Sequence, residues 1–451
     1  MGLKTLALAV STVGFLIGAG GGPVGAATGD ASPRVVPEVL TLEKAVNLGL
    51  SNHPSLRVAS GTQAVNEALV GQAQSGLYPQ VQGQTSYTRR TTNPASTFNG
   101  IGFPQRISRG DITPFYQNGV TLNQLLYDFG TIKSQVDAAK YSLQAANSDA
   151  ETTLQTVVVN VQQAYFSLQQ GQRLVTVSEE AIAQFKKHLA LANGRFKAGV
   201  APKIDVTTAE VDLSNAQLNL IRAKNNLLVA RVTLNNAMGI RSSDAYRVEE
   251  PTATLHGQIV MEEAVELAMR LRPEMISQQA QEQASEASIK AAQGTYFPTV
   301  NSSASYSYSG TESPLVYNWN VAGTVNVPIF SGFLTKQQVA QARANLLKTK
   351  ANGDVLRQNI LLEVSQALFN LEAAQEGLRV TAVIVVQARE RLALVEGRYR
   401  AGLSNAIEVT DAEVALVNAQ VNDVVAMSVY QSAGAQLDRA MGLSTPVKGN
   451  S

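Results

Sequence analysis

Apolar and polar residues alternate at every second position in two neighbouring segments of the second half of the chain. Residues 299–309 and 316–328 each place aliphatic and aromatic side chains on one side and mainly Asn, Ser and Thr on the other. A period of two residues is typical of a β-strand, and the turn between the segments contains Gly and Pro. The pattern therefore predicts a strand hairpin. A weaker form of it predicts strands at 80–90 and 115–127.

Most other apolar residues recur at helical spacing. Short helices are expected at 41–52 and 260–271, because a proline follows each, and a second helix continues from each proline to an aromatic-proline pair. Long helices are expected at about 131–192, 203–238, 334–395 and 405–441. In the last of these, the valines from Val414 to Val424 follow the heptad spacing of a coiled-coil seam.

Two long stretches of the chain are copies of each other. Residues 41–87 match 260–306 without a gap, and residues from 126 onward match those from 329 onward in the same way. The first copy is 16 residues longer, and the excess lies where residues 91–112 are rich in Asn, Ser, Thr, Gly and Pro and predict a loop. Such a repeat indicates a duplicated structural unit. We expect a first repeat at 27–240, a linker at 241–259, a second repeat at 260–442 and a tail at 443–451.

The N-terminus has the features of an export signal. Lys4 precedes a largely apolar run from Leu6 to Ile17, and Val24-Gly25-Ala26 fits a small-x-small cleavage site. The run is shorter than the ~20 apolar residues that a transmembrane helix needs. Residues 1–26 are therefore predicted to be a signal peptide, and if the exported chain crosses a membrane we expect it to do so as strands.

Composition excludes several classes of protein. The net charge is +1, so there is no basic surface for nucleic acid. Cysteine is absent, which excludes disulfides, thiol catalysis and a lipidated N-terminal cysteine. The three histidines are scattered, and no nucleophile, base or metal-ligand set stands at usable spacing. We expect neither an enzyme nor a protein that holds a metal or another cofactor.

The predicted strands have the length and alternation of outer membrane strands, which run for ~9–11 residues. Lipid does not tolerate an open sheet edge, and the strands of one chain are too few to close a barrel. Chains must therefore pool strands, and three chains would supply enough for an open lumen. A soluble sheet with one buried face is the alternative. Aromatic residues near the strand ends fit a membrane-interface girdle instead: Tyr306, Tyr308, Tyr317 and Trp319.

Several short motifs accompany the duplicated elements: Asn52-His53-Pro54-Ser55-Leu56, Leu77-Tyr78-Pro79, Val327-Pro328-Ile329-Phe330, and Arg-Phe/Tyr-x-x-Gly at 195 and 398. In this order, over residues 40–442, they resemble the TolC-type outer membrane efflux protein family. The resemblance implies a mainly helical homotrimer whose 12-stranded outer membrane barrel continues into a periplasmic α-helical barrel. It also implies export of small molecules or polypeptides from a Gram-negative cell, with a periplasmic adaptor protein and an inner membrane transporter as partners.

The long helices of each pair are expected to turn beside Gly199 and Gly402, which supply the conformation of a helix C-terminus. Val200 and Leu403 follow these glycines and are apolar residues at exposed tips. They either belong to the turns alone or contact a partner. The resemblance implies that these four residues contact the helical tips of the adaptor.

Glu408 and Asp411 lie just beyond the second turn, spaced i,i+3 on one helical face. In a trimer three such pairs would form a ring of carboxylates at the narrow periplasmic mouth, and acidic rings select cations. Acidic residues at a helix start also complement the helix dipole without any further role. The resemblance favours the gate, because the two positions match the aperture carboxylates of the family.

The resemblance further implies that links between neighbouring tips hold the closed state. Asp205 and Tyr399 occupy positions that match one such hydrogen bond. Ser404 replaces the arginine that supplies a further link, so closure is either weaker here or held by other residues, such as Arg398 or Lys203.

Two other classes of protein share parts of this pattern. A periplasmic coiled-coil adaptor has a long helical hairpin, but it would carry a single hairpin flanked by the halves of a lipoyl-like domain. A secreted filament protein is built on long helices, but it gives no reason for amphipathic strands. The cargo, whether drug, metal or polypeptide, does not follow from the lumen residues, which are generic Asn, Ser and Gln.

Overall fold

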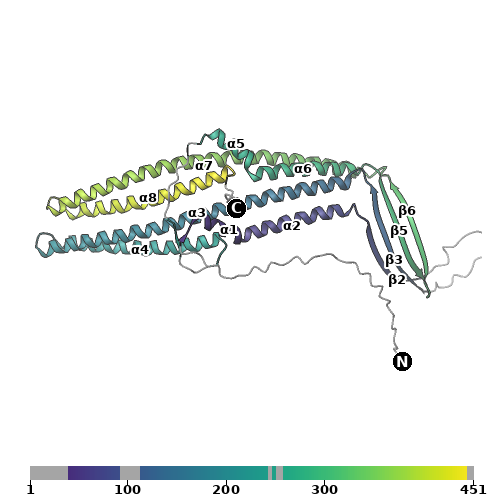
Figure 1. Cartoon of the computed structure of the whole chain (residues 1–451), viewed down its shortest axis with the longest axis horizontal. Helices are drawn as coiled ribbons and strands as arrows, with labels where there is room; N and C mark the ends of the chain where they lie inside the picture. Colours follow the sequence, from purple (N-terminus) through teal and green to yellow (C-terminus); the bar gives the residue numbers. More distant parts are fainter. Residues whose placement is uncertain (1–38, 92–111, 242–245, 250–256, 258, 444–451) are drawn as a thin grey trace, which may run out of the picture.

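The computed structural model describes residues 39–91, 112–241, 246–249, 257 and 259–443. The predicted signal peptide, the interior of the predicted loop at 91–112, much of the linker and nearly all of the tail lie outside the described residues. The described part is elongated, with a sheet at one end and two long helical hairpins pointing away from it (Figure 1).

Both repeats contain the same series of elements, so the predicted order is confirmed. The first repeat consists of α1 (Leu42–Asn52), α2 (Pro54–Ser75), β2 (Gln80–Thr91), β3 (Ile112–Tyr127), α3 (Thr131–Lys197) and α4 (Lys203–Ala237). The second consists of α5 (Met261–Leu271), α6 (Pro273–Gly294), β5 (Thr299–Gly310), β6 (Val316–Asn326), α7 (Leu334–Arg400) and α8 (Ala406–Ala440). Two short strands, β1 (Val39–Leu40) and β4 (Arg247–Val248), pair in parallel and attach the linker to the first repeat.

The long helices α3 and α7 end five residues later than the sequence predicts. Gly194 and Gly397 lie inside the last turns and do not end the helices, whereas Gly199 and Gly402 take left-handed backbone angles and do. Each long helix contains 67 residues and is therefore about 100 Å long.

The main sheet joins the two repeats. Its strand order is β2-β3-β5-β6, every pair is antiparallel, and β3 pairs with β5 along most of its length. The outer strands β2 and β6 each have one edge without a partner strand in the described chain. The sheet buries neither face well, and Val81, Trp319 and Val321 are each more than 60% exposed.

The helices form one layer rather than a globular bundle. Along α3, the helices α2 and α4 follow each other on one side, and α6 and α8 follow each other on the other side (Figure 1). Helix α7 then packs against α6 and α8. Among the described residues, no helix combines the length and continuous apolar character that a membrane span requires.

The core is concentrated midway along this layer. One cluster packs α1, α3 and the end of α4 around Leu168 and Leu234, and Tyr165 donates a hydrogen bond from its hydroxyl to the carbonyl of Leu40 at 3.0 Å. A second cluster packs α5, α7 and α8 around Ile360 and Leu437. Away from these clusters burial is thin, and α2 contains no buried residue. The long helical faces therefore need further packing partners.

The buried side chain of Arg272 lies where the start of α6 meets α7 and the end of α8. We call this region the joint of the second repeat. The Nη1 of Arg272 lies 2.6 Å from a carboxylate oxygen of Glu363 on α7, and its Nη2 lies 3.0 Å from Glu274 on α6. Arg439 of α8 approaches the same Glu274 at 4.0 Å. These contacts link α6, α7 and α8 to one another.

Candidate functional site

The two hairpin tips lie together at the end of the molecule farthest from the sheet (Figure 1). At each tip the backbone N–H two residues beyond the helix C-cap donates a hydrogen bond back into the last turn. Val200 donates to the carbonyl of Arg195 at 3.0 Å, and Leu403 donates to that of Arg398 at 2.9 Å. This Schellman geometry needs the left-handed glycine between them. It leaves the Val200 and Leu403 side chains 65% and 71% exposed, so both apolar groups are available for contact.

Glu408 is held in place by its own hairpin. Asn405 caps α8 by accepting the backbone N–H of Glu408 at 2.9 Å, and the Ser404 hydroxyl donates to the Glu408 carboxylate at 2.8 Å. The guanidinium of Arg398 lies 3.8 Å from the same carboxylate. Asp411 follows one turn later and is exposed. The second tip thus presents two adjacent acidic groups, of which Glu408 is oriented and Asp411 is free to meet solvent.

The residues predicted to lock the gate do not all meet within one chain. Ser404 bonds to Glu408 inside its own turn. The ring of Tyr399 is buried, with the guanidinium of Arg195 lying 4.4 Å from its centroid, and burial raises the pKa of its hydroxyl. That hydroxyl has no hydrogen-bond partner in the described part of the chain, so the link from Tyr399 to Asp205 is not made here. Arg195, which begins the first Arg-Phe-x-x-Gly motif but was not predicted to take part in closure, also donates to the backbone carbonyl of Tyr399 and joins the two tips.

The predicted aromatic residues gather at the hairpin end of the sheet. Tyr306 faces Trp319 across the β5–β6 ladder, and Tyr308 faces Tyr317. All are exposed, and the hydroxyls of Tyr306 and Tyr308 lie 3.1 Å apart. They form an amphipathic edge of the kind found at membrane interfaces.

A second aromatic group, which the sequence reasoning missed, lies at the opposite end of the sheet where strands turn into helices. Phe129 stacks on Phe297 with ring centroids 5.1 Å apart, and Phe330 packs edge-on against Phe333. Phe129 and Phe333 both have positive φ angles, 54° and 66°, which are unusual for bulky residues. Both phenylalanines lie in the turn that precedes a long helix, once in each repeat. This repetition in the sequence could have indicated the aromatic group. The sheet is therefore bounded by exposed aromatic side chains at both ends.

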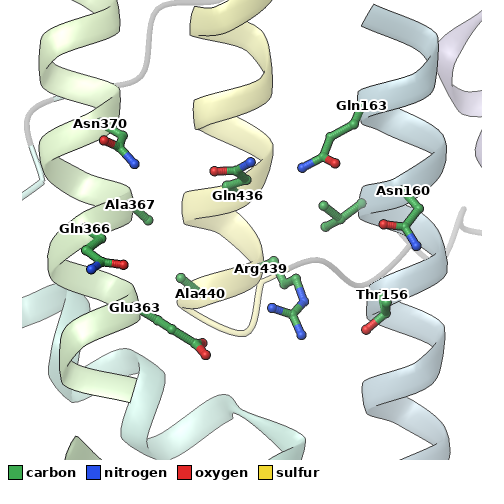
Figure 2. Close-up of a pocket in the computed structure, with 11 residues that line it drawn as sticks. Thr156, Asn160, Gln163, Glu363, Gln366, Ala367, Asn370, Gln436, Arg439 and Ala440 are labelled. Carbon is green, nitrogen blue, oxygen red and sulfur yellow. The ribbon is translucent and has the colours of Figure 1, made fainter. Parts of the chain in front are cut away.

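A polar groove of about 460 Å³ lies between α3, α7 and α8, near the joint of the second repeat. Figure 2 shows amide side chains from all three helices along it, with Gln163 from α3, Gln366 from α7 and Gln436 from α8. Glu363 and Arg439 supply its charged groups. Apart from these two residues, the polar part of the wall consists of neutral hydrogen-bonding groups.

The family of the chain follows from a comparison with known proteins. The family model described as "Outer membrane efflux protein" matches residues 45–240 and 264–443, which is both repeats. The chain belongs to the outer membrane efflux protein family. The predicted resemblance is thereby confirmed, and the alternative readings as a periplasmic adaptor or a filament protein are wrong.

Individual members of this family align over most of their length. The outer membrane efflux protein BepC of Brucella suis is 23% identical over 84% of this chain and 80% of its own. A membrane protein of Pseudomonas aeruginosa superimposes with a TM-score of 0.78 at 24% identity, covering 89% of this chain and 93% of its own. The open state of the Neisseria gonorrhoeae MtrE outer membrane channel superimposes with a TM-score of 0.72 at 18% identity, over 89% of each chain. The fold is thus that of the outer membrane channels, and this efflux-family chain is an outer membrane export channel protein with a large periplasmic helical part.

One polar cluster in this efflux-family chain was not predicted. We call the residues Gln184, His188, Glu396 and Glu413 the tip cluster, because they lie between the two hairpins a few turns from their tips. Glu413 lies one helical turn after Val409, and both are buried. The predicted seam holds at Val424, which is buried, and at Val417, which packs against the cluster around Phe185, but it is wrong at Val414. Val414 is 42% exposed, and the neighbouring Glu413 takes the buried position.

Proposed function

We propose that three copies of the chain form one continuous conduit. The observation that carries the proposal is the four-stranded sheet, whose β2 and β6 edges are unpaired and whose exposed apolar residues continue to the aromatic groups at both ends. Lipid would not tolerate these edges. Pairing the β6 edge of one copy with the β2 edge of the next closes a 12-stranded barrel. The apolar residues left exposed on α4, such as Val211 and Ile221, would then pack between subunits.

Glu408 and Asp411 form the selectivity gate of this conduit. Threefold assembly brings the second hairpins together around the axis, and each contributes one oriented and one exposed carboxylate. Acidic rings of this kind attract cations and repel anions. Tyr399 and Asp205 link neighbouring tips when the gate is closed. Ser404 instead bonds to Glu408 inside its own turn, and Arg195 and Arg398 add links inside each subunit.

The hairpin tips dock a periplasmic adaptor that connects the conduit to an inner membrane transporter. Val200 and Leu403 are exposed apolar groups on rigid turns, and their glycine neighbours allow close approach of another helix tip. The polar groove wall lets hydrated solutes pass without trapping them. The cargo is small toxic molecules, by analogy with relatives named as antibiotic and toluene efflux pump outer membrane proteins.

Two measurements test this function. Purified protein should migrate as a heat-sensitive trimer and form cation-selective channels in planar bilayers, and the paired change Glu408→Gln with Asp411→Asn should reduce the selectivity. Unchanged reversal potentials in the double variant would contradict the gate. A deletion strain should become sensitive to toxic compounds and recover with the intact gene. Unaltered sensitivity, with loss of a secreted polypeptide instead, would replace the small-molecule cargo by a polypeptide.

A further inference from the structure

A buried acid and a buried imidazole face each other between the two hairpins. The Nδ1 of His188 on α3 lies 3.9 Å from Oε1 of Glu413 on α8, and the two residues are 5% and 2% exposed. The amide of Gln184 donates to Glu396 at 2.6 Å and reaches the same Glu413 oxygen at 3.5 Å. The other oxygen of Glu413 is buried without a hydrogen-bond partner in the described chain. A buried carboxyl group with one unpartnered oxygen is destabilising in its ionised form.

The charged groups around the pair are mostly acidic. Helix α4 contributes Asp212 and Asp205, and α7 contributes Glu396 together with the neutral ring of Tyr399. Glu396 is paired with the exposed Arg400 at 3.0 Å, and Asp212 accepts a hydrogen bond from Thr410 of α8 at 3.2 Å. Few positive charges are therefore available to hold Glu413 in its ionised form.

Burial raises the pKa of Glu413 to about 8, and Glu396 and Asp212 add to the rise against the opposing hydrogen bond from Gln184. Burial also lowers the pKa of His188, although the nearby carboxylates act in the other direction. Together the two side chains hold a single proton at neutral pH while the hairpins are packed. The pair holds this one proton whether it resides on the imidazole or on the carboxyl group.

We propose that the His188–Glu413 pair makes opening of the tips pH-dependent, because the pair keeps one proton while the hairpins are packed and releases it when they separate. The inference rests on the proposed gate. His188 and Glu413 belong to different hairpins, so any separation of α3 from α8 admits water to both. In water Glu413 returns to its ordinary pKa of 4.5 and His188 to 6.5.

The direction of the effect follows from these values. The raised pKa of Glu413 stabilises the packed state at low pH, and this stabilisation is lost as the pH rises from 4.5 to about 8. The lowered pKa of His188 acts oppositely below 6.5, because the hydrated imidazole takes up a proton. The two effects oppose each other below 6.5. The ratio of open to closed tips should therefore rise about tenfold between pH 6.5 and 8, and change less steeply with pH below 6.5.

Bilayer recordings of the full chain at stepped pH test the proposal, with open probability as the readout. Glu413→Gln should abolish the rise between pH 6.5 and 8. His188→Gln should instead extend the rise to lower pH, by roughly twentyfold between pH 5 and 6.5. The matched control is Glu210→Gln, since Glu210 is the counterpart of Glu413 in the first repeat and is exposed on α4. It should behave as the wild type does.

Infrared difference spectra of the same protein report the proton directly and do not require gating. The wild type should contain a protonated carboxyl group at pH 7 that titrates near 8, and this band should be missing in Glu413→Gln. Its absence from the wild type, or an unchanged pH response in Glu413→Gln, would overturn the inference. If the channels remain cation-selective in that case, the proposed gate stands alone. If the wild type forms no channels, the proposed function is wrong, and the inference is wrong with it.

Discussion

Replacing Arg272 with alanine should loosen the joint that carries the second hairpin. Its side chain is 4% exposed and is bound to Glu363 at 2.6 Å and to Glu274 at 3.0 Å. Removing one partner of a buried ion pair typically destabilises a protein by ~3–5 kcal/mol. The carboxylates here are 48% and 21% exposed, so water stabilises part of the freed charge. We therefore expect a loss of about 2–3 kcal/mol of stability.

The assay is the rate of unfolding at a fixed temperature in detergent, followed by the loss of helical circular dichroism, since such assemblies unfold irreversibly. A loss of 2–3 kcal/mol corresponds to at most ~30- to 150-fold faster unfolding. Burial raises the pKa of Glu274, but its hydrogen bonds to Arg272 outweigh this and leave the pKa below its ordinary value of 4.5. The stabilisation is therefore present above pH 4.5 and lost as the pH falls below it, so the two proteins should converge in acid.

The control for this variant is Arg379→Ala, which breaks an exposed ion pair with Glu376 on α7. Because solvent screens that pair, its unfolding rate should match that of the wild type. Equal rates for Arg272→Ala and the wild type at pH 7 would refute the reasoning that the buried network holds the joint. If unfolding were accelerated equally in both variants, the buried ion pair would contribute no more to stability than the exposed one.

Three further predictions concern the turns. Gly239→Ala should prevent assembly of the core midway along the chain or weaken it strongly, because φ is 69° and the added Cβ would lie 2.7 Å from the Cα of His53. Gly199→Ala also has a left-handed φ but meets open space, so its melting temperature should fall only slightly, by a strain of ~1 kcal/mol. Leu403→Asp should keep trimers and conductance yet abolish efflux and crosslinking to the adaptor, and retained efflux would show that the tip residue does not dock a partner.

The order of elements could be predicted because the sequence carries local periods. The strands alternate with a period of two, and Gly199 and Gly402 mark turns that only a left-handed residue allows. The ends of the long helices were less accurate, since Gly194 and Gly397 resemble a helix end in sequence but remain inside the last turn. A single glycine destabilises a helix by only ~1 kcal/mol, and the hydrogen bonds of the neighbouring turns offset this loss.

The inner surfaces between hairpins could not be predicted from the same periods. In α8 the apolar residues are frequent enough to support two adjacent seams, and only packing against α3 decides that Glu413, rather than Val414, is buried. The same limit applies to Arg195. From the sequence it is a solvated charge at the end of α3, whereas in the structure its guanidinium packs on the ring of Tyr399. Contacts between distant segments, such as these, leave no local trace in the sequence.

The duplication explains where the function is concentrated. At three matched positions the two repeats differ in charge or in burial. The first repeat has His53 where the second has Arg272, and Thr208 where the second has Asp411. The exposed Glu210 of the first repeat matches the buried Glu413 of the second. Buried and oriented charges make a packing arrangement depend on water and protons. The packing of the second hairpin therefore depends more on acidic side chains than that of the first.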